Sequence, residues 1–309
     1  MPLPDEVLSA LESFHRSSDF SRRGAVITDL DGTAVHEREG RVVIPEPVEF
    51  GLKALLDRGR PIVLNSLRFP LNILQSFGRE WYSITDAPIP TVTLNGSLLG
   101  RLVEKGDSLA FEEIEAFPLR LAEIEDVLGA VGSLLDQGVR ELLLFHYPRD
   151  WTVGEIIWTP DADRIPHVTG KYNSASRVIS EPVASLRERL SRADVCMILL
   201  LIDLPQDRLM AYQHAGTGFR TRAGVDKREG AIQIARHLGV SLADSVGAGD
   251  TVMDTFLREV GLSIHVGNPD LPFAGRRATI RLRDSLELGE LLFRLADLQG
   301  RVRSAPVRG

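Results

Sequence analysis

The chain has 309 residues, a net charge of −7 and an apolar share of 43 %, values that predict a globular protein of two domains, or of one large domain with an insertion. The acidic balance argues against a nucleic-acid surface but leaves room for small phosphorylated molecules, which need only a local positive site. No apolar run approaches the about 20 residues of a membrane helix, and the acidic first residues argue against a signal peptide. The single cysteine, Cys196, excludes an internal disulfide, so we expect a cytoplasmic protein. From the acidic charge and the short apolar runs we expect that it binds no nucleic acid and no membrane.

Strand and helix patterns alternate in the first third of the chain. Short apolar runs predict strands at residues 25–30, 61–64 and 91–94, and amphipathic spacing predicts helices at 47–58 and 69–81. A strand–helix rhythm of this kind is typical of a parallel sheet covered by helices. We therefore expect residues 1–96 to form the first segment of an α/β core, a doubly wound parallel sheet of the Rossmann-like type.

The same rhythm returns in the last third. The patterns predict helices at 229–238, 251–260 and 286–298, and strands at 245–246 and 262–266. We expect residues 223–309 to complete the core.

The middle of the chain, residues 97–222, breaks this alternation. Predicted helices at 119–136 and 183–191 mix there with predicted strands at 141–146, 152–158 and 194–201. We interpret this segment as a second, α+β domain that is inserted into the core.

The most informative segment is Ala-Val-Ile-Thr-Asp-Leu-Asp-Gly-Thr, at residues 25–33. In a buried parallel strand, Asp29 and Asp31 would emerge at the carboxyl end, where open α/β sheets bind their ligands. Side chains two residues apart project to the same side of an extended chain, so the two carboxylates converge. Close negative charges need a cation or a shared proton, which suggests a hard metal ion and a carboxylate nucleophile.

Two other interpretations of this segment stay open. Asp and Gly also favour an ordinary turn after a strand, and Asp-x-Asp-Gly resembles the start of a calcium-binding loop. The calcium loop is the weaker alternative, because Val35 and Glu37 hold its later ligand positions and Gly40 stands where its final Glu would be.

Three later segments carry further candidate residues. Ser66 follows a predicted strand, where a hydroxyl can hold a phosphate oxygen, although most such serines belong to turns or helix caps. Asp250 follows another predicted strand, and Asp254 would share its face of the predicted helix, although a glycine-rich turn with an acidic helix start explains both. Lys227 precedes a predicted helix, where a solvated surface lysine is the plain alternative.

Taken in order, these residues resemble a known set of motifs. The set is Asp29-x-Asp31-Gly-Thr, then Ser66, then Lys227, then Gly-Asp250-Thr-x-x-Asp254, and it resembles the haloacid dehalogenase-like (HAD) superfamily of phosphohydrolases. The long insertion between Ser66 and Lys227 is similar to the C2 cap of the Cof-type, or IIB, branch. That branch includes sucrose-phosphate and mannosyl-3-phosphoglycerate phosphatases. Asn95-Gly96 and Asn268 also resemble family positions.

The resemblance implies a role for each catalytic residue. Asp29 would be the nucleophile that forms an aspartyl-phosphate, and Asp31 would protonate the leaving oxygen and later activate water. Ser66 and Lys227 would hold the phosphoryl oxygens.

The resemblance also implies a metal site. Mg²⁺ would be bound by Asp29, the carbonyl of Asp31 and Asp250, with Asp254 supporting these ligands; Mg²⁺ prefers such hard oxygen atoms. Three positions depart from the usual family residues: Leu67 and Arg228 stand in place of Gly, and Met253 stands in place of Asn.

We therefore predict a Mg²⁺-dependent phosphatase that acts on a small phosphorylated metabolite, a sugar or sugar-acid phosphate by family analogy. A phosphomutase of the same fold and a non-catalytic protein that binds a phosphorylated ligand are the alternatives. Within the cap, Arg149 and Lys171 are candidates for substrate binding, chosen by polarity and position. The sequence sets neither the physiological substrate nor the oligomeric state.

Overall fold

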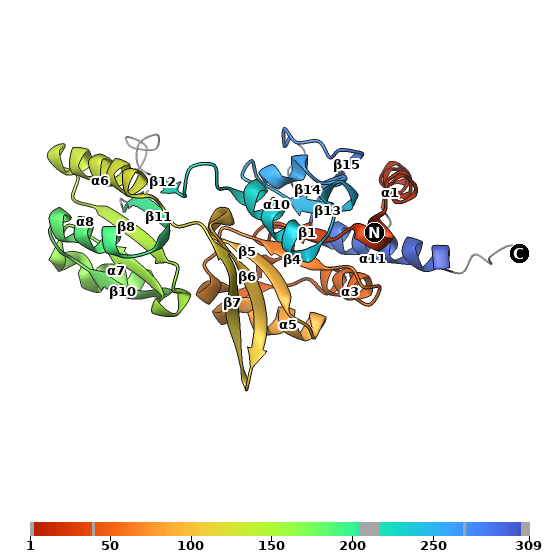
Figure 1. Ribbon diagram of the computed structural model, residues 1–309, viewed down its shortest axis with the longest axis horizontal. Coiled ribbons are helices and arrows are strands. Elements are labelled where there is room, and N and C mark those ends of the chain that lie inside the picture. The colour runs from red at the N-terminus through yellow and green to blue at the C-terminus, as the bar shows by residue number, and fades with distance from the viewer. Residues whose placement is uncertain (1–2, 39–40, 204–216, 268–269, 304–309) are drawn as a thin grey trace, which may run out of the picture. The chain divides into compact units, whose positions relative to one another are not determined.

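Figure 1 shows the computed structural model, which describes residues 3–38, 41–203, 217–267 and 270–303. Asn268 lies outside these residues. The chain divides into two compact units. The first holds Met1–Arg68, Ile73–Ile114 and Asp226–Gly309, and the second holds Phe69–Asn72 and Glu115–Val225. Every helix in the described ranges is too short or too polar to cross a membrane.

An eight-stranded sheet forms the centre of the first unit. Its strand order is β15-β14-β13-β1-β4-β5-β6-β7. The pairs from β15 to β5 are parallel, and β6 is antiparallel to β5. The strands are β1 (Val26–Thr28), β4 (Ile62–Asn65), β5 (Ile89–Thr93), β6 (Leu98–Lys105), β7 (Ser108–Ala116), β13 (Val246–Gly249), β14 (Leu262–Val266) and β15 (Ala278–Leu282).

The order in which successive strands are added to the sheet reverses at β1. Strands β4 and β5 follow β1 on one side, and β13, β14 and β15 lie on the other. Val26 pairs with Val246 of β13 and with Ile62 of β4, so the carboxyl ends of all three strands lie together. Such a switch point is where doubly wound sheets bind ligands. The sheet confirms the predicted doubly wound α/β core.

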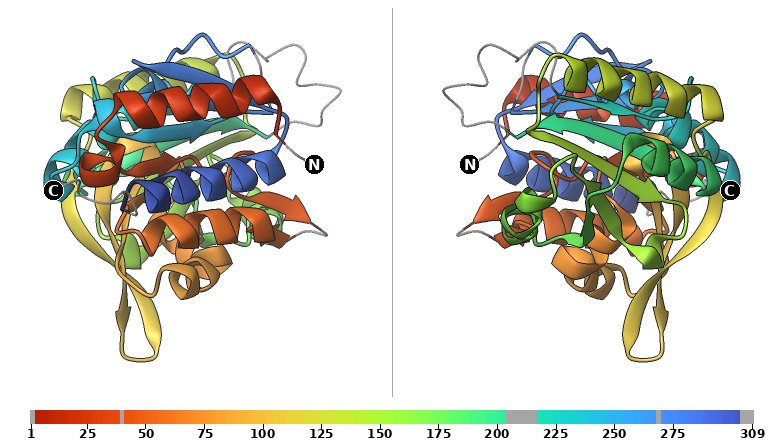
Figure 2. Two further views of the ribbon diagram at one scale, coloured as in Figure 1. Left: turned by 90° about the vertical axis from the view of Figure 1, so that its right-hand side faces the viewer. Right: turned by 90° about the vertical axis from the view of Figure 1, so that its left-hand side faces the viewer.

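Helices cover this sheet, and two of them pack very closely. In α3, buried Val48, Leu52 and Leu55 recur on one face of the helix. A Cβ atom at Gly51 would lie 2.6 Å from the carbonyl oxygen of Gly289 in α11, so both glycines permit the contact. Figure 2 shows α1, α11 and α3 side by side. The helices of this unit are α1 (Asp5–Ser17), α2 (Phe20–Arg23), α3 (Glu46–Leu56), α5 (Arg79–Thr85), α10 (Lys227–Leu238) and α11 (Ser285–Arg303).

Shorter elements complete the first unit and its link to the second. The strands β2 (His36–Arg38) and β3 (Arg41–Val43) form a hairpin. The helix predicted at 69–81 is a succession of α4 (Pro70–Ile73), a π-helical segment η1 (Leu74–Gly78) and α5. Three 3₁₀ turns are η2 (Leu94–Gly96), η5 (Leu242–Asp244) and η6 (Thr255–Arg258).

The second unit is a five-stranded sheet with helices, an α+β arrangement as predicted for the inserted segment. The strand order is β10-β9-β8-β11-β12, with β8 antiparallel to both neighbours. Its elements are α6 (Leu121–Asp136), β8 (Leu142–Pro148), η3 (Trp151–Val153), β9 (Glu155–Trp158), η4 (Ala162–Arg164), α7 (Ile165–Lys171), β10 (Ala175–Ile179), α8 (Val183–Arg192), β11 (Val195–Ile202) and β12 (Thr217–Arg220).

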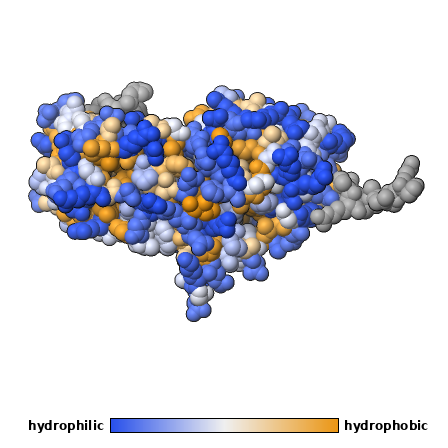
Figure 3. Space-filling view, viewed as in Figure 1, coloured by the Kyte–Doolittle hydropathy of each residue, from blue (hydrophilic) through white to orange (hydrophobic). Residues whose placement is uncertain are grey.

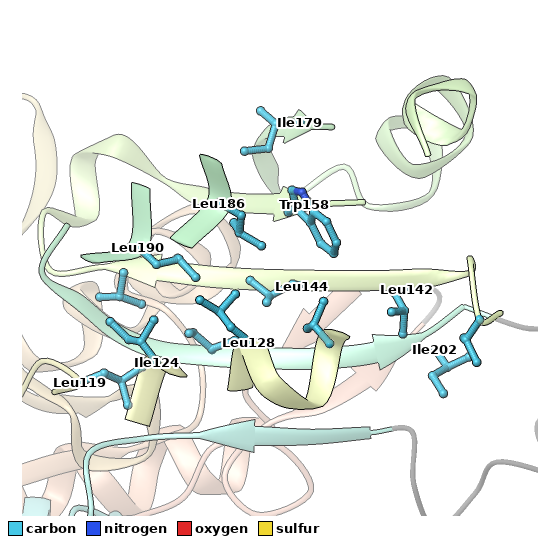
Figure 4. Close-up of a cluster of buried hydrophobic side chains, with 14 residues drawn as sticks. Leu119, Ile124, Leu128, Leu142, Leu144, Trp158, Ile179, Leu186, Leu190 and Ile202 are labelled. Atoms are coloured by element: carbon cyan, nitrogen blue, oxygen red, sulfur yellow. The ribbon is translucent and has the colours of Figure 1, made fainter. Parts of the chain in front are cut away.

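The second unit has a hydrophobic core of its own. Side chains from α6, α8 and the sheet meet there, among them Leu128, Leu144, Trp158 and Leu186, each at most 2 % exposed. Figure 4 shows this cluster between the helices and the strands. On the outside, Figure 3 shows polar and charged residues over most of the visible surface, with apolar residues in smaller patches.

Two predictions about the fold are wrong. The first boundary of the inserted segment lies near residue 115 and not at 97, because β6 and β7 extend the sheet of the first unit. The helix predicted at 251–260 is also not formed. Residues 251–254 are a turn, and only the short η6 follows.

Candidate active site

The ends of three neighbouring strands bring together the predicted acidic and hydroxyl residues. Asp29 follows β1, and its backbone N–H donates to the carbonyl of Ala248 in β13 at 2.9 Å. Asp250 follows the last residue of β13. Ser66 follows β4 and is 1 % exposed, and its N–H donates to the carbonyl of Val92 at 2.9 Å. The parallel register therefore places these residues at one edge of the sheet.

Lys227 joins two of the carboxylates at this edge. Its Nζ lies 2.7 Å from Oδ1 of Asp29 and 2.7 Å from Oδ1 of Asp254. All three residues are buried, and Lys227 is only 1 % exposed. The Asp226 side chain caps the helix α10 that starts at Lys227, and the side-chain amide of Asn65 donates to the Lys227 carbonyl at 2.9 Å. The interpretation of Lys227 as a solvated surface lysine is therefore wrong.

The charges of this cluster do not balance. Burial raises the pKa of Asp29 to about 7; the Lys227 charge opposes the rise and the Asp254 charge adds to it. Burial and the charge of Asp254 also raise the pKa of Asp250. Burial disfavours the ammonium form of Lys227, but Asp29 and Asp254 outweigh burial and raise its pKa. One lysine therefore leaves the surrounding carboxylates short of positive charge.

Asp254 acts as a clamp on the loop after β13. Its Oδ2 accepts hydrogen bonds from the backbone N–H groups of Asp250 at 3.0 Å and Thr251 at 2.9 Å, while Oδ1 contacts Lys227. Gly249 makes room for this carboxylate, because a Cβ there would lie 2.6 Å from its Cγ. Asp254 thus fixes the backbone that carries Asp250.

The residues present fit a hard divalent cation. Asp29, Asp250 and Asp254 offer carboxylate oxygens that all lie within 4.8 Å of one another. Carboxylate oxygens are the ligands that Mg²⁺ prefers, and the shortage of positive charge is what such an ion would relieve. Because Asp254 already bonds Lys227 and two backbone N–H groups, Asp29 and Asp250 are the better ligands of the three.

The turn after β1 is shaped around Asp250. Gly32 has a φ of +77°, and a Cβ there would lie 2.2 Å from Oδ2 of Asp250. Thr33 is buried, and its hydroxyl donates to Oδ1 of Asp250 at 3.2 Å. Gly32 and Thr33 therefore position a carboxylate from the neighbouring strand.

Asp31 has a partner that the sequence did not suggest. Arg68 binds both of its oxygens, with Nε at 2.7 Å from Oδ2 and Nη2 at 2.6 Å from Oδ1. The backbone N–H of Arg68 donates to the Ser66 hydroxyl at 3.1 Å. In the sequence, the only sign of this contact is that Arg68 is a basic residue two positions after Ser66. The contact itself depends on the fold, which brings Arg68 close to Asp31.

The two candidates of the second unit pair with different acids. Arg149, which follows β8, forms an exposed ion pair with Asp194 at 3.6 Å. Lys171, at the end of α7, contacts the buried carboxylate of Asp203, which Arg164 also binds at 2.7 Å. Their predicted contact with a substrate stays a prediction.

The structure gives the surroundings of the three residues that depart from the usual family residues. Leu67 is half-buried beside Ser66. Arg228 lies outside the buried cluster, where its Nε pairs with Glu259 at 2.6 Å. The backbone N–H of Met253 donates to the Thr251 hydroxyl at 3.3 Å, within the turn that Asp254 closes. None of the three removes a charged group from the buried cluster.

Comparison with known proteins finds similarity in structure alone, since no family model and no curated protein matches this chain. The solved structure of the HAD subclass IIB sugar phosphatase BT4131 superposes with a TM-score of 0.58 at 18 % identity, over 87 % of this chain and 96 % of that one. BT1666 of Bacteroides thetaiotaomicron, a HAD phosphatase, gives 0.59 at 13 % identity, over 90 % and 96 %. TM0651 of Thermotoga maritima gives 0.58 at 16 %, over 88 % and 97 %.

Proposed function

The chain has the fold of the HAD superfamily and of its subclass IIB, and on that premise we propose that it is a Mg²⁺-dependent phosphatase. Its reaction is the hydrolysis of a phosphate monoester of a small metabolite. The observation that carries the proposal is the buried contact of Asp29 with Lys227, 2.7 Å long, where β1 and β13 end side by side. A carboxylate held beside a fixed cation, at the switch point of the sheet, suits attack on a phosphoryl group.

Asp29 is the nucleophile in this proposal. One of its carboxylate oxygens forms a bond to phosphorus while the bond from phosphorus to the leaving oxygen breaks. Lys227 and Ser66 hold the phosphoryl oxygens, and Asp31 gives a proton to the leaving oxygen so that a neutral alcohol departs.

The second half of the reaction frees the enzyme. Water attacks the phosphorus of the aspartyl-phosphate, Asp31 takes a proton from that water, and the bond from phosphorus to Asp29 breaks. The products are inorganic phosphate and a regenerated Asp29 carboxylate.

Asp29, the carbonyl of Asp31 and Asp250 are the proposed ligands of Mg²⁺, with Asp254 holding the loop of Asp250 in place. When bound, the ion supplies positive charge that offsets the negative charge of the phosphoryl group. Activity is therefore expected to depend on Mg²⁺ and to fall when EDTA removes it.

A sugar or sugar-acid phosphate is the proposed substrate. The support is the similarity to BT4131, a sugar phosphatase whose chain this one covers almost entirely, together with the inserted α+β unit. Cys196 is the single cysteine of the chain and is buried, which supports the cytoplasm as the proposed compartment.

A screen of phosphorylated metabolites tests the proposal. The purified protein is incubated with Mg²⁺ and a panel of sugar and sugar-acid phosphates, and released inorganic phosphate is measured with and without EDTA. Release that stops with EDTA is expected. Conversion that needs a sugar bisphosphate activator and releases no phosphate would indicate a phosphomutase. No turnover of any ester, p-nitrophenyl phosphate included, would indicate a protein that only binds its ligand.

A further inference from the structure

Arg68 binds Asp31, the proposed general acid, through two hydrogen bonds. Its guanidinium donates to both carboxylate oxygens of Asp31, at 2.7 and 2.6 Å. Its Cζ lies 5.5 Å from the centre of the Phe77 ring, and Nη1 lies 3.4 Å from the Ser76 hydroxyl. The guanidinium is therefore held in a defined orientation beside Asp31.

The main chain of Arg68 belongs to the proposed phosphate site. Its N–H donates to the Ser66 hydroxyl at 3.1 Å, and its carbonyl accepts from the N–H of Leu94 at 3.2 Å. The position of the guanidinium is thus tied to the same loop that presents Ser66.

This ion pair explains little of the stability of the fold. The Asp31 side chain is 53 % exposed and that of Arg68 is 23 % exposed. Exposed pairs of this kind contribute about 0–1 kcal/mol to stability. A function in the reaction is therefore the better reason for so well-formed a pair.

The pair as it stands opposes the proposed action of Asp31. A carboxylic acid that donates a proton carries that proton on one oxygen, and here both oxygens accept N–H groups from Arg68. A protonated carboxyl keeps lone pairs that accept hydrogen bonds, but it loses the negative charge that strengthens both bonds from Arg68. Asp31 therefore cannot act as a proton donor and keep its charge-assisted pair with Arg68.

We propose that Arg68 is a phosphate-binding residue that exchanges the Asp31 carboxylate for the phosphoryl oxygens when the substrate binds. A phosphate dianion carries more charge than a carboxylate and accepts the same two parallel N–H bonds, so it competes for the guanidinium. The exchange moves no proton, because Arg68 keeps its charge throughout. It frees Asp31 only when a phosphoryl group is present. This inference rests on the proposed function.

Binding of inorganic phosphate in the presence of Mg²⁺, measured by calorimetry, tests the exchange. Arg68→Ala should weaken binding by about 10-fold or more, the size of a lost charge-assisted hydrogen bond. Arg68→Lys, which keeps the charge but loses the planar fork, should weaken binding less. Asp31→Ala should strengthen it several-fold, because Arg68 no longer has to leave a partner. In the Arg68→Ala background the Asp31→Ala change should give a clearly smaller gain.

A matched variant controls for the loss of an arginine–carboxylate pair. Arg189 binds both oxygens of Glu181 in the second unit, each at 2.8 Å, and Arg189→Ala should leave phosphate binding unchanged. An equal effect of Asp31→Ala in both backgrounds would overturn the exchange, since a simple charge effect is additive. If the wild-type protein hydrolyses p-nitrophenyl phosphate and the effects of the two substitutions on phosphate binding are additive, only the exchange is overturned. If the wild-type protein neither hydrolyses p-nitrophenyl phosphate nor binds phosphate, the proposed function is overturned as well.

Discussion

At the scale of single residues, one ammonium group holds together the centre of the site. Lys227 contacts Asp29 and Asp254 at 2.7 Å each, with all three side chains buried. Burying such a cluster is costly, but breaking it is costlier, because the carboxylates that remain keep their charge without a partner. Lys227 therefore stabilises the site as well as serving the proposed reaction.

Lys227→Met keeps the aliphatic length and removes the charge. We expect the free energy of unfolding without metal to fall by about 3–5 kcal/mol, the size found when one partner of a buried ion pair is lost. Urea denaturation measures it. Lys53→Met is the control, since Lys53 pairs with Asp57 at 2.7 Å on an exposed helix face and should cost at most about 0.5 kcal/mol. Equal losses in the two variants would contradict a structural role for Lys227.

Two glycines with similar φ angles allow an effect on the metal site to be distinguished from an effect on the stability of the fold. Gly32 has a φ of +77° and Gly59 a φ of +74°, so alanine costs about 1 kcal/mol of stability at either. Only at Gly32 would the new Cβ meet a side chain, 2.2 Å from Oδ2 of Asp250, while nothing lies within 4 Å at Gly59.

Gly32→Ala should therefore displace the Asp250 carboxylate, and Gly59→Ala should not. We expect the Mg²⁺ concentration for half-maximal phosphate release to rise about 10-fold or more in the first variant, as for lost support of a metal ligand. Thermal unfolding should shift by similar amounts in both. An unchanged Mg²⁺ requirement in Gly32→Ala would argue against Asp250 as a ligand.

The sequence predicts some residues of this site better than others. Asp29, Ser66 and Asp250 each come after a predicted strand, so strand ends alone indicate them. The burial of Lys227 does not follow from its place at the start of a helix. It depends on which strand ends the fold brings next to that helix. The partner of Arg68 is also hidden, since the pairing with Asp31 joins two strand ends that are far apart in sequence.

At the scale of elements, the turn at 251–254 shows how a side chain can replace a helix. The spacing of apolar residues predicts a helix at 251–260, but the Asp254 carboxylate accepts the N–H groups of Asp250 and Thr251. A local side-chain acceptor of this kind competes with the start of a helix. Periodicity does not reveal such competition, which is why the prediction is wrong at this element.

Strand β8 buries a histidine at the centre of the second unit. His146 is 2 % exposed, and burial, with a smaller effect of the Arg189 charge, lowers its pKa to about 4. In the unfolded chain the imidazole titrates near 6.5. Between these values the unfolded chain binds a proton that the folded one does not, so stability that is present above pH 6.5 is lost as the pH falls toward 4.

His146→Gln removes this titration. We expect the free energy of unfolding of the parent protein to fall by up to about 3 kcal/mol from this group between pH 6.5 and 4, and to fall less steeply in the variant. Urea denaturation at a series of pH values measures both slopes. Identical slopes would show that His146 takes up its proton without unfolding the unit.

At the scale of the whole molecule, the chain is an α/β core with an inserted α+β unit, as the rhythm of predicted strands and helices indicates. The inserted unit begins near residue 115, because β6 and β7 belong to the core sheet. An alternating apolar pattern marks a strand, but it does not tell which of two sheets the strand joins. The position of the first boundary was therefore not available from the sequence.

The inserted unit is the proposed source of substrate choice. Arg149→Ala and Lys171→Ala should change the ratio of kcat/KM among sugar phosphates more than they change turnover of p-nitrophenyl phosphate, whose leaving group offers no sugar hydroxyls. Lys105→Ala, at an exposed position of the core strand β6, should leave the ratios unchanged. If both cap variants behave like the parent on the whole panel, other residues of the unit select the substrate, or the unit does not select at all.

The most direct test of the proposed reaction is a comparison of the wild-type protein with Asp29→Asn. The substitution keeps the size of the side chain but removes the nucleophile and one negative charge. With p-nitrophenyl phosphate and Mg²⁺ we expect measurable phosphate release from the wild type and a loss of at least about 10³-fold in kcat for the variant, with the fold retained in circular dichroism. Release by the variant at a rate near that of the wild type would contradict Asp29 as the nucleophile.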